Sequence, residues 1–468
     1  MKKNIYPFYL SVFGILLIII SPNMLSDGMF MDGLFYAIIS KNLANGVGDF
    51  WHLHLTKTLD PVFVVHPPLV FGLQSLFFKV FGDSIYVERI YSLLTYVVTG
   101  IIVVRIWKKL IKNNSNQTAW LPLLFWVITP VVFWAVPNNM LENTMMIFTS
   151  LSVLFILKSL KNRRFIYLIL AGFSIFCAFL SKGFVGLFTL SFIFWIFIIK
   201  REISFKRFFT DTVVLVFSTL LPSIVLYFAV PESVDSILAY INTQVIGSVM
   251  NIQTVETRFF ILIRLFLELI PVFSLVLLSV AFTFRIKFSN SNKKWFWVFL
   301  LLGLSGVVPI MISMKQSGFY MLATFPIFSI AFALLIVERV SYLMEKINTE
   351  GIKFKIYKYT SIAIFVIGIS LVLYNSNKIG RDKNKIEDVH TVAEIVKKNT
   401  IIAVEPKMST DWSLHGYFAR YHYISLNYNT PPVNEEYLLV YKPSDFDIPP
   451  EYVIVPIDLN NYLLYKKH

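Results

Sequence analysis

Long apolar runs recur along this chain and are separated by short polar connections. Runs of about 20 apolar residues are long enough to cross a bilayer. The pattern predicts eleven spans, at about residues 5–22, 86–107, 120–136, 142–158, 165–181, 184–199, 208–230, 258–284, 295–313, 319–337 and 357–375. The segment 67–82 is shorter and contains Lys79, so we predict that it lies on the membrane surface. The chain is therefore predicted to be a polytopic α-helical membrane protein.

Two regions outside these runs have patterns of their own. From Asp32 to Asn45-Gly46, apolar residues recur at helical spacing, which predicts an amphipathic helix in the membrane interface. Beyond residue 375, apolar and polar residues alternate as in strands in IIAVEP, YHYISLNY, EYLLVYK and EYVIVPI, and two helical stretches lie among them. We predict a transmembrane catalytic domain at 1–375, whose loop 23–85 carries interfacial helices, and a small α/β domain at 376–468.

Composition and charge support this class and predict an orientation. The chain is 56% hydrophobic, with a mean hydropathy of +0.67. Each of the five even-numbered connections carries four or five Lys or Arg residues, whereas the short odd-numbered ones carry only Lys182, Arg258 and Lys315. The positive-inside rule then places the N-terminus in the cytoplasm, and loop 23–85 and the α/β domain outside the plasma (inner) membrane. The net charge of +14 is thus a topology signal that requires no nucleic-acid partner.

Two carboxylates stand at the starts of helices on the predicted outer side. Asp32 begins the amphipathic helix, where the helix dipole favours an anion. Glu142 begins the fourth span. For each residue, one interpretation is a helix cap and the other is a functional carboxylate.

Two cationic candidates lie on the same side. His66 precedes two prolines and an apolar helix, a rigid extended element that would hold its imidazole near a lipid headgroup. Lys182 precedes Gly183, which gives the backbone beside it conformational freedom. Lys182 could instead be a lysine that snorkels at a helix end.

Two other pairs have open interpretations. His52 and His54 would share one face of an extended strand, where they could bind a divalent metal or serve as polar edge residues. No cofactor is required by the sequence. Arg264 and Glu268 lie four apart in the eighth span and could form an intrahelical pair or line a groove.

Four stretches in order resemble a known family. They are DGLFYAIISKNL with HPPL and ERIYS, then MLENTMMIFTSLSVLFIL, then FLSKGFVGL, and then KQSGFYMLATFPIFSIAFALL. Together, over about residues 25–340, they resemble the family 39-like glycosyltransferases of the GT-C fold, which include protein O-mannosyltransferases and the lipid A aminoarabinose transferase. The chain departs from the family pattern at Gly33, where a second acid is usual, at His66, often Lys, and at Glu142, usually Asp.

The resemblance implies sugar transfer, with inversion, from a polyprenyl-phosphate carrier to a protein, lipid or glycan acceptor outside the membrane. Asp32 would be the base, and Glu142 would orient the acceptor or share that role. The implied phosphate-binding residues are His66, Lys182, Arg258 and Lys315, and the implied groove residues are Tyr36, Arg264, Glu268 and Tyr320. The rival hypotheses are a transporter or lipid flippase, for which we find no repeated halves, and a scaffold for the C-terminal domain.

Overall fold

The computed structural model describes residues 5–111, 115–250, 252–286, 288, 291–429 and 435–468. The chain forms two compact units. Unit one comprises Met1–Ser21, Val64–Val70 and Ser92–Tyr374, and unit two comprises Pro22–Phe63, Phe71–Tyr91 and Asn375–His468. Our functional division at residue 375 stays a prediction, while the contacts group most of loop 23–85 with the C-terminal residues.

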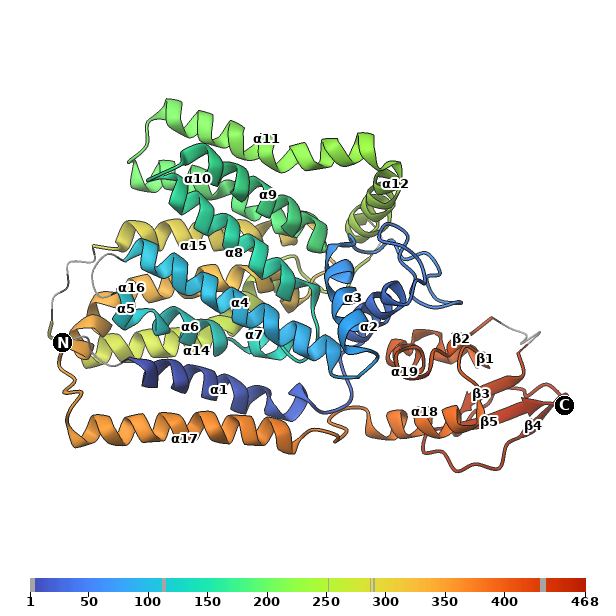
Figure 1. Cartoon of the computed structure of the whole chain (residues 1–468). Helices are drawn as coiled ribbons and strands as arrows, with labels where there is room; N and C mark the ends of the chain where they lie inside the picture. Colours follow the sequence, from blue (N-terminus) through green and yellow to red (C-terminus); the bar gives the residue numbers. More distant parts are fainter. Residues whose placement is uncertain (1–4, 112–114, 251, 287, 289–290, 430–434) are drawn as a thin grey trace. The chain divides into compact units, whose positions relative to one another are not determined.

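Unit one is helical (Figure 1). Its elements, two of which extend into unit two at one end, are α1 (Tyr6–Met24), α4 (Val87–Leu110), α5 (Ser115–Thr118), α6 (Trp120–Val127), α7 (Pro130–Ala135), α8 (Leu141–Ser159), α9 (Arg164–Lys182), η1 (Phe184–Ser191), α10 (Phe192–Trp195), η2 (Ile196–Lys200), α11 (Phe205–Ala229), α12 (Pro231–Tyr240), η3 (Ile241–Ile246), α13 (Gly247–Met250), α14 (Phe260–Phe282), α15 (Lys293–Val307), η4 (Val308–Ile312), η5 (Gly318–Thr324), α16 (Phe325–Glu345) and α17 (Ile352–Tyr374). Within the described residues, nine segments are helical, long and apolar enough to cross a membrane. The predicted polytopic helical class is confirmed.

The two other predicted spans form shorter helices. The 120–136 segment breaks between α6 and α7, because Pro130 has no N–H group with which to continue the helix. The 184–199 segment divides into η1, α10 and η2, which are 3-10, α and π helices in turn. The 67–82 segment is the short helix α3 (Leu69–Phe81).

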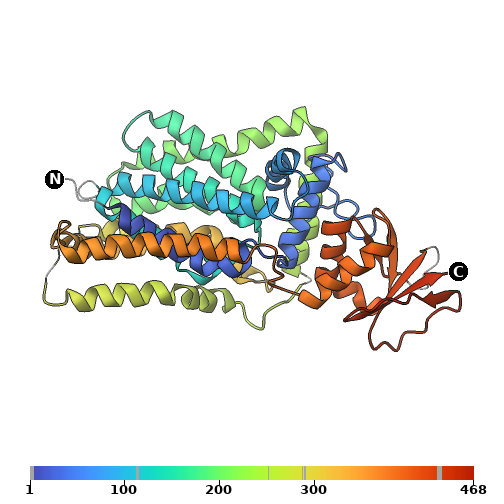
Figure 2. The same ribbon diagram turned by 60° about the horizontal axis from the view of Figure 1, so that its bottom comes forward.

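Small residues let the helices of unit one approach closely. A Cβ atom on Gly172 of α9 would lie 2.8 Å from the backbone carbonyl carbon of Ser218 in α11. A Cβ on Gly368 of α17 would lie 2.8 Å from the Cβ of Leu17 in α1, and these two helices lie side by side (Figures 1 and 2). Such contacts are typical of helix association in lipid, where backbones pack closely at small residues.

We expect Gly172→Ala to destabilise the α9–α11 contact. The added methyl group overpacks the interface, at a cost of about 1–3 kcal/mol. Gly100→Ala in α4 is the matched control, because its Cβ would meet nothing nearer than 3.5 Å. Thermal unfolding in detergent should therefore show a lower midpoint for Gly172→Ala only. Equal midpoints in the two variants would contradict this packing.

Unit two contains α2 (Met31–Ala44), most of α3, and the C-terminal α18 (Lys383–Ile395), η6 (Pro406–Thr410) and α19 (Trp412–His422). Its strands are β1 (Ile401–Val404), β2 (Ser425–Asn427), β3 (Tyr437–Tyr441), β4 (Tyr452–Ile454) and β5 (Tyr462–Lys467). They form one sheet in the order β2-β1-β3-β5-β4, in which β1 is parallel to β2 and β3, and β5 is antiparallel to β3 and β4. The predicted α/β region is confirmed, and β5 is an additional strand that we did not predict.

Side chains on the two faces of the sheet enter different cores. Ile402 of β1 packs with α18 and α19, whereas its neighbour Ala403 faces the opposite side, where Phe446 packs. This is the two-residue alternation of a strand. Leu34 of α2 belongs to the same core as α18 and α19. Helix α2 therefore packs into the core formed by the C-terminal residues.

Candidate active-site residues

Glu142 and Lys182 form a buried ion pair in unit one. Glu142 is the second residue of α8 and Lys182 is the last residue of α9, two helices that pack against each other. The Lys182 Nζ lies 2.6 Å from Glu142 Oε1, and the two side chains are 7% and 0% exposed. The N-cap position of α8 belongs to Met140, so Glu142 is not the capping residue. Removal of one partner of such a buried charge pair strongly destabilises the folded protein, because the charge that remains is no longer compensated.

Gly183 makes the backbone turn after Lys182 possible. Its φ is +83°, and a Cβ atom at this position would overlap the Tyr240 hydroxyl group. Burial raises the pKa of Tyr240, which ends α12, to about 12. The Lys-Gly pair in the sequence indicated backbone freedom here. Because Tyr240 lies far along the chain, the sequence did not indicate what fills the space.

Aromatic rings surround the Lys182 ammonium group. Its Nζ lies 5.4 Å from the ring centroid of Phe319 and 5.6 Å from that of Tyr320, both in η5. Phe319 stacks in turn on Trp134, with 5.9 Å between centroids. We predicted Tyr320 as a groove residue from the family motif, whereas Phe319 was missed although it stands beside it in the same motif.

His66 lies within the electrostatic reach of two of the predicted cations. Burial first, and then the charges of Lys182 and Lys315, lower the pKa of His66 well below its usual value. The imidazole is therefore neutral near pH 7. The Lys315 Nζ lies 3.4 Å from the Gln244 side-chain oxygen. Unit one thus brings together His66, Lys182 and Lys315, three of the four residues that we predicted to bind phosphate.

Arg258, the fourth predicted phosphate ligand, contacts backbone oxygens. Its guanidinium group donates to the carbonyls of Met311, at 3.2 Å, and Ile312 at the end of η4. The amide nitrogen of Gln316 donates to the carbonyl of Arg258, and its side-chain oxygen accepts from the N–H of Ile261. These bonds tie the start of α14 to the segment that carries Lys315.

Arg264 and Glu268 form the predicted pair within α14. The Arg264 guanidinium nitrogen lies 2.7 Å from Glu268 Oε1. The other oxygen of Glu268, which is 1% exposed, accepts a 2.6 Å hydrogen bond from the N–H of Val131 at the start of α7. Gly318 lies close to Arg264, because a Cβ there would be 3.0 Å from the Arg264 Nε. The pair therefore connects α14, α7 and η5.

Asp32 occupies the first turn of α2 in unit two, as predicted. The helix begins at Met31, so Asp32 is its second residue. The N-cap position belongs to Phe30, whose side chain cannot accept a hydrogen bond. The capping interpretation therefore does not describe Asp32, although the helix dipole still favours its negative charge. Tyr36, one turn further on, is 4% exposed and packs its ring against Phe71.

The two candidate metal ligands bind different partners. The Nδ1 of His52 lies 2.9 Å from the Asp49 carboxylate, and the Nδ1 of His54 lies 2.7 Å from the Pro61 carbonyl. Within the described part of the chain, no group of three or more His, Cys, Asp or Glu side chains is arranged to hold a metal ion.

Similarity to solved structures identifies the fold. ArnT from Cupriavidus metallidurans bound to undecaprenyl phosphate superposes over 98% of this chain and 97% of its own, with a TM-score of 0.65 and 12% identity. The chain has the GT-C glycosyltransferase fold. The GT-C match extends to apo ArnT, with a TM-score of 0.64, 12% identity and coverage of 96% and 95%.

Two further comparisons agree with the GT-C fold. The Archaeoglobus fulgidus oligosaccharyltransferase, solved with Zn and sulfate, matches with a TM-score of 0.52 and 12% identity, over 93% of this chain and 67% of that one. Residues 65–228 match the model of the dolichyl-phosphate-mannose-protein mannosyltransferase family. A search of curated protein sequences finds no match.

Proposed function

We propose that this chain is a membrane glycosyltransferase that transfers a sugar from a polyprenyl-phosphate donor to a protein, lipid or glycan acceptor. The carrying observation is the match of almost the whole chain to ArnT, whose structure holds undecaprenyl phosphate. The cations Lys182 and Lys315 beside the neutral imidazole of His66 support this proposal, because a phosphate that leaves needs positive charge and hydrogen-bond donors around it.

The proposed reaction is a single displacement with inversion. The acceptor oxygen or nitrogen forms a bond to the anomeric carbon, while the bond from that carbon to the phosphate oxygen breaks. The Asp32 carboxylate takes the acceptor proton as general base. The departing electron pair remains on the phosphate, where Lys182 and Lys315 offset the added negative charge and His66 donates a hydrogen bond. In the substrate-free enzyme, Glu142 holds Lys182 in place.

We further propose the inner membrane as the location, with the N-terminus in the cytoplasm and the reaction on the outer side. The asymmetry of Lys and Arg among the connections supports this orientation. Cysteine accessibility provides a test. The native Cys177 is buried in α9, so a thiol reagent should report on single cysteines that are introduced elsewhere. A membrane-impermeant reagent should label a cysteine in the 376–468 region, and not one in the 159–163 connection, in intact cells.

Sugar transfer by the purified full-length chain tests the proposal. The protein is incubated with radiolabelled polyprenyl-phosphate sugars and, separately, with nucleotide sugars, and label is followed into lipid and protein fractions. We expect transfer from the polyprenyl-phosphate donor only. Mass spectrometry of glycolipids and glycoproteins from cells with and without the chain supplies the acceptor for the assay. Solute accumulation in proteoliposomes without any transfer would instead favour the transporter hypothesis.

Binding of the donor should strengthen as the pH falls. An anionic phosphate beside His66 raises the pKa that burial, Lys182 and Lys315 hold low in the unliganded enzyme. The complex therefore binds more protons than the unliganded enzyme, so acidification favours the complex. The donor is a phosphodiester and does not titrate in this range. Donor affinity measured from pH 8 to pH 5 should rise in the wild type and stay flat in His66→Asn. Equal slopes would contradict this role for His66.

A further inference from the structure

The C-terminal end of α2 is fixed by a buried lysine. Lys41 is 1% exposed, and its Nζ donates a 2.6 Å hydrogen bond to the carbonyl of Arg420 in α19. The same Nζ lies 3.4 Å from the Asp83 carboxylate and 3.5 Å from the ring centroid of Tyr423. Burial and the neighbouring Arg420 lower the pKa of Lys41 to about 8, although Asp83 and Glu88 act against this. Lysines are almost never fully buried without partners.

Arg420 completes a cluster of four charges that includes Lys41. It is 1% exposed, and its guanidinium group forms a bidentate pair with Glu88, at 2.9 and 3.1 Å. Its third nitrogen lies 2.7 Å from Asp83. Bidentate guanidinium–carboxylate bonds fix orientation as well as distance. With two cations and two carboxylates, the cluster thus joins α2 and α19 to the start of α4 and the turn before it.

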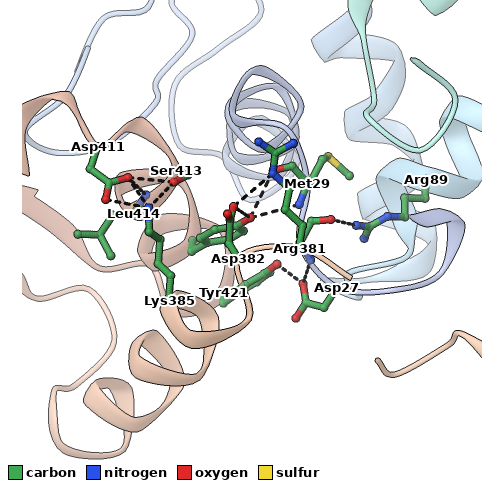
Figure 3. A network of polar contacts seen from close by, with 12 residues as sticks. Asp27, Met29, Arg89, Arg381, Asp382, Lys385, Asp411, Ser413, Leu414 and Tyr421 are labelled. Atoms are coloured by element: carbon green, nitrogen blue, oxygen red, sulfur yellow. Dashed lines mark hydrogen bonds and ion pairs between the residues drawn. The ribbon is translucent and has the colours of Figure 1, made fainter. Parts of the chain in front are cut away.

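The residues just before α2 are fixed by a second network (Figure 3). Tyr421 donates to the Asp27 carboxylate, and the N–H of Met29 donates to the Tyr417 hydroxyl group at 3.3 Å. Arg89 donates to the carbonyl of Gly28 at 2.7 Å. Burial acts to raise the pKa of Asp27, but hydrogen bonds, among them that from Tyr421, outweigh it and hold the pKa below its usual value. Asp27 is therefore charged at neutral pH.

The middle of α2 packs directly on α19. A Cβ atom on Gly416 would lie 3.1 Å from the side chain of Leu34, so the glycine lets the two helices pack closely. The rings of Phe35 and Trp412 meet edge to face, with 6.3 Å between centroids. Contacts along the whole length of α2, with a polar network at each end, fix both its position along its axis and its tilt.

We propose that residues 375–468 position the catalytic base by holding α2, the helix that carries Asp32. Arg420 holds the C-terminal end of α2 through Lys41, and Tyr421 holds the residues before its N-terminal end through Asp27. The inference rests on the proposed function, since it requires Asp32 to act on the acceptor. Displacement of a catalytic group by about 1 Å can cost on the order of 10²-fold in rate. The networks at the two ends restrict such displacement.

Turnover per donor-binding enzyme tests the inference. The full-length variants Lys41→Met, Arg420→Met, Arg420→Lys and Tyr421→Phe are compared with the wild type. Lys466→Met is the control, because its ion pair with Glu436 at 3.2 Å is about half exposed and such pairs contribute little. The stoichiometry of polyprenyl-phosphate sugar binding counts the folded molecules, and the Kd reports donor affinity. The turnover number kcat is then expressed per donor-binding molecule, and KM is measured alongside it.

We expect kcat to fall by about 10²-fold in Lys41→Met and Arg420→Met, with donor Kd, KM for the donor and binding stoichiometry unchanged. Arg420→Lys should recover part of the rate, because it keeps the charge and loses the bidentate geometry. If Arg420→Met does not fold, Tyr421→Phe, which removes one hydroxyl group, should still lower kcat at constant donor binding.

The inference is overturned if kcat per donor-binding molecule stays within twofold of the wild type in Lys41→Met and Tyr421→Phe. It is also overturned if the loss appears only as fewer donor-binding molecules, because the networks would then serve stability alone. Failure of the proposed function gives a different result: the wild type itself transfers no sugar, or Asp32→Asn transfers as fast as the wild type.

Discussion

Asp32→Asn should slow sugar transfer strongly while donor binding persists. Asparagine has nearly the same shape as aspartate and keeps the first turn of α2, but it cannot accept the acceptor proton. General-base catalysis typically contributes about 10²–10⁴-fold to a rate, so kcat should fall by that factor. The donor Kd should not change, since the proposed phosphate ligands are His66, Lys182 and Lys315. The measurement is transfer from a radiolabelled polyprenyl-phosphate sugar.

Asp60→Asn provides the matched control in the same loop. Asp60 is exposed and has a φ of +44°, a conformation that asparagine also tolerates well. Its substitution should leave kcat unchanged. Equal turnover in the wild type and Asp32→Asn would remove Asp32 from the catalytic role, and equal loss in the two variants would show that the loop is merely sensitive to charge.

Lys182→Met should have the second large effect, on both stability and donor binding. It removes the cation that lies 2.6 Å from the buried Glu142 carboxylate, and loss of one member of a buried ion pair typically costs about 3–5 kcal/mol of folding free energy. It also removes a cation from the proposed phosphate site. We therefore expect a low yield of folded protein and little binding of the donor by the part that folds.

The double variant Glu142→Gln/Lys182→Met separates these two consequences. Removal of both charges leaves no buried carboxylate that has lost its cation, so the yield and thermal midpoint should recover. Donor affinity should remain weaker by about 10–100-fold, the value of a hydrogen bond to a charged group. Recovery of donor affinity to the wild-type value would show that Lys182 serves only to neutralise Glu142.

The sequence carried most of the membrane architecture because hydropathy depends on local composition. In the part of the chain that the structure describes, nine long apolar helices match predicted spans, and the helical stretches around Val389 and Tyr417 form α18 and α19. The two predicted spans that break lie where local chemistry is unusual, at Pro130 and after Gly183. The strand β5 was missed because YLLYKK does not alternate apolar and polar residues and ends in charged residues.

The candidate site could be predicted only as single residues. Asp32, Glu142, His66 and Lys182 were found from their positions at helix ends and from the family motifs. The pairing of Glu142 with Lys182 was not predicted, since the two residues are 40 positions apart and no local pattern relates them. Lys41 was not singled out from the sequence. Its burial depends on Arg420, a partner that no sequence pattern near α2 indicates.

Unit two combines early and late segments of the chain, so the order of synthesis determines when it can form. Lys41 emerges from the ribosome 379 residues before Arg420, to whose carbonyl it donates. The sheet that supports α19 needs β5, which lies between β3 and β4. Until the C-terminal residues are translated, the Nζ of Lys41 lacks the Arg420 carbonyl to which it donates. A nascent chain with all its spans inserted would thus lack part of the network that holds the helix of Asp32, the proposed base. Sugar transfer should begin only after the late segment has joined the early one.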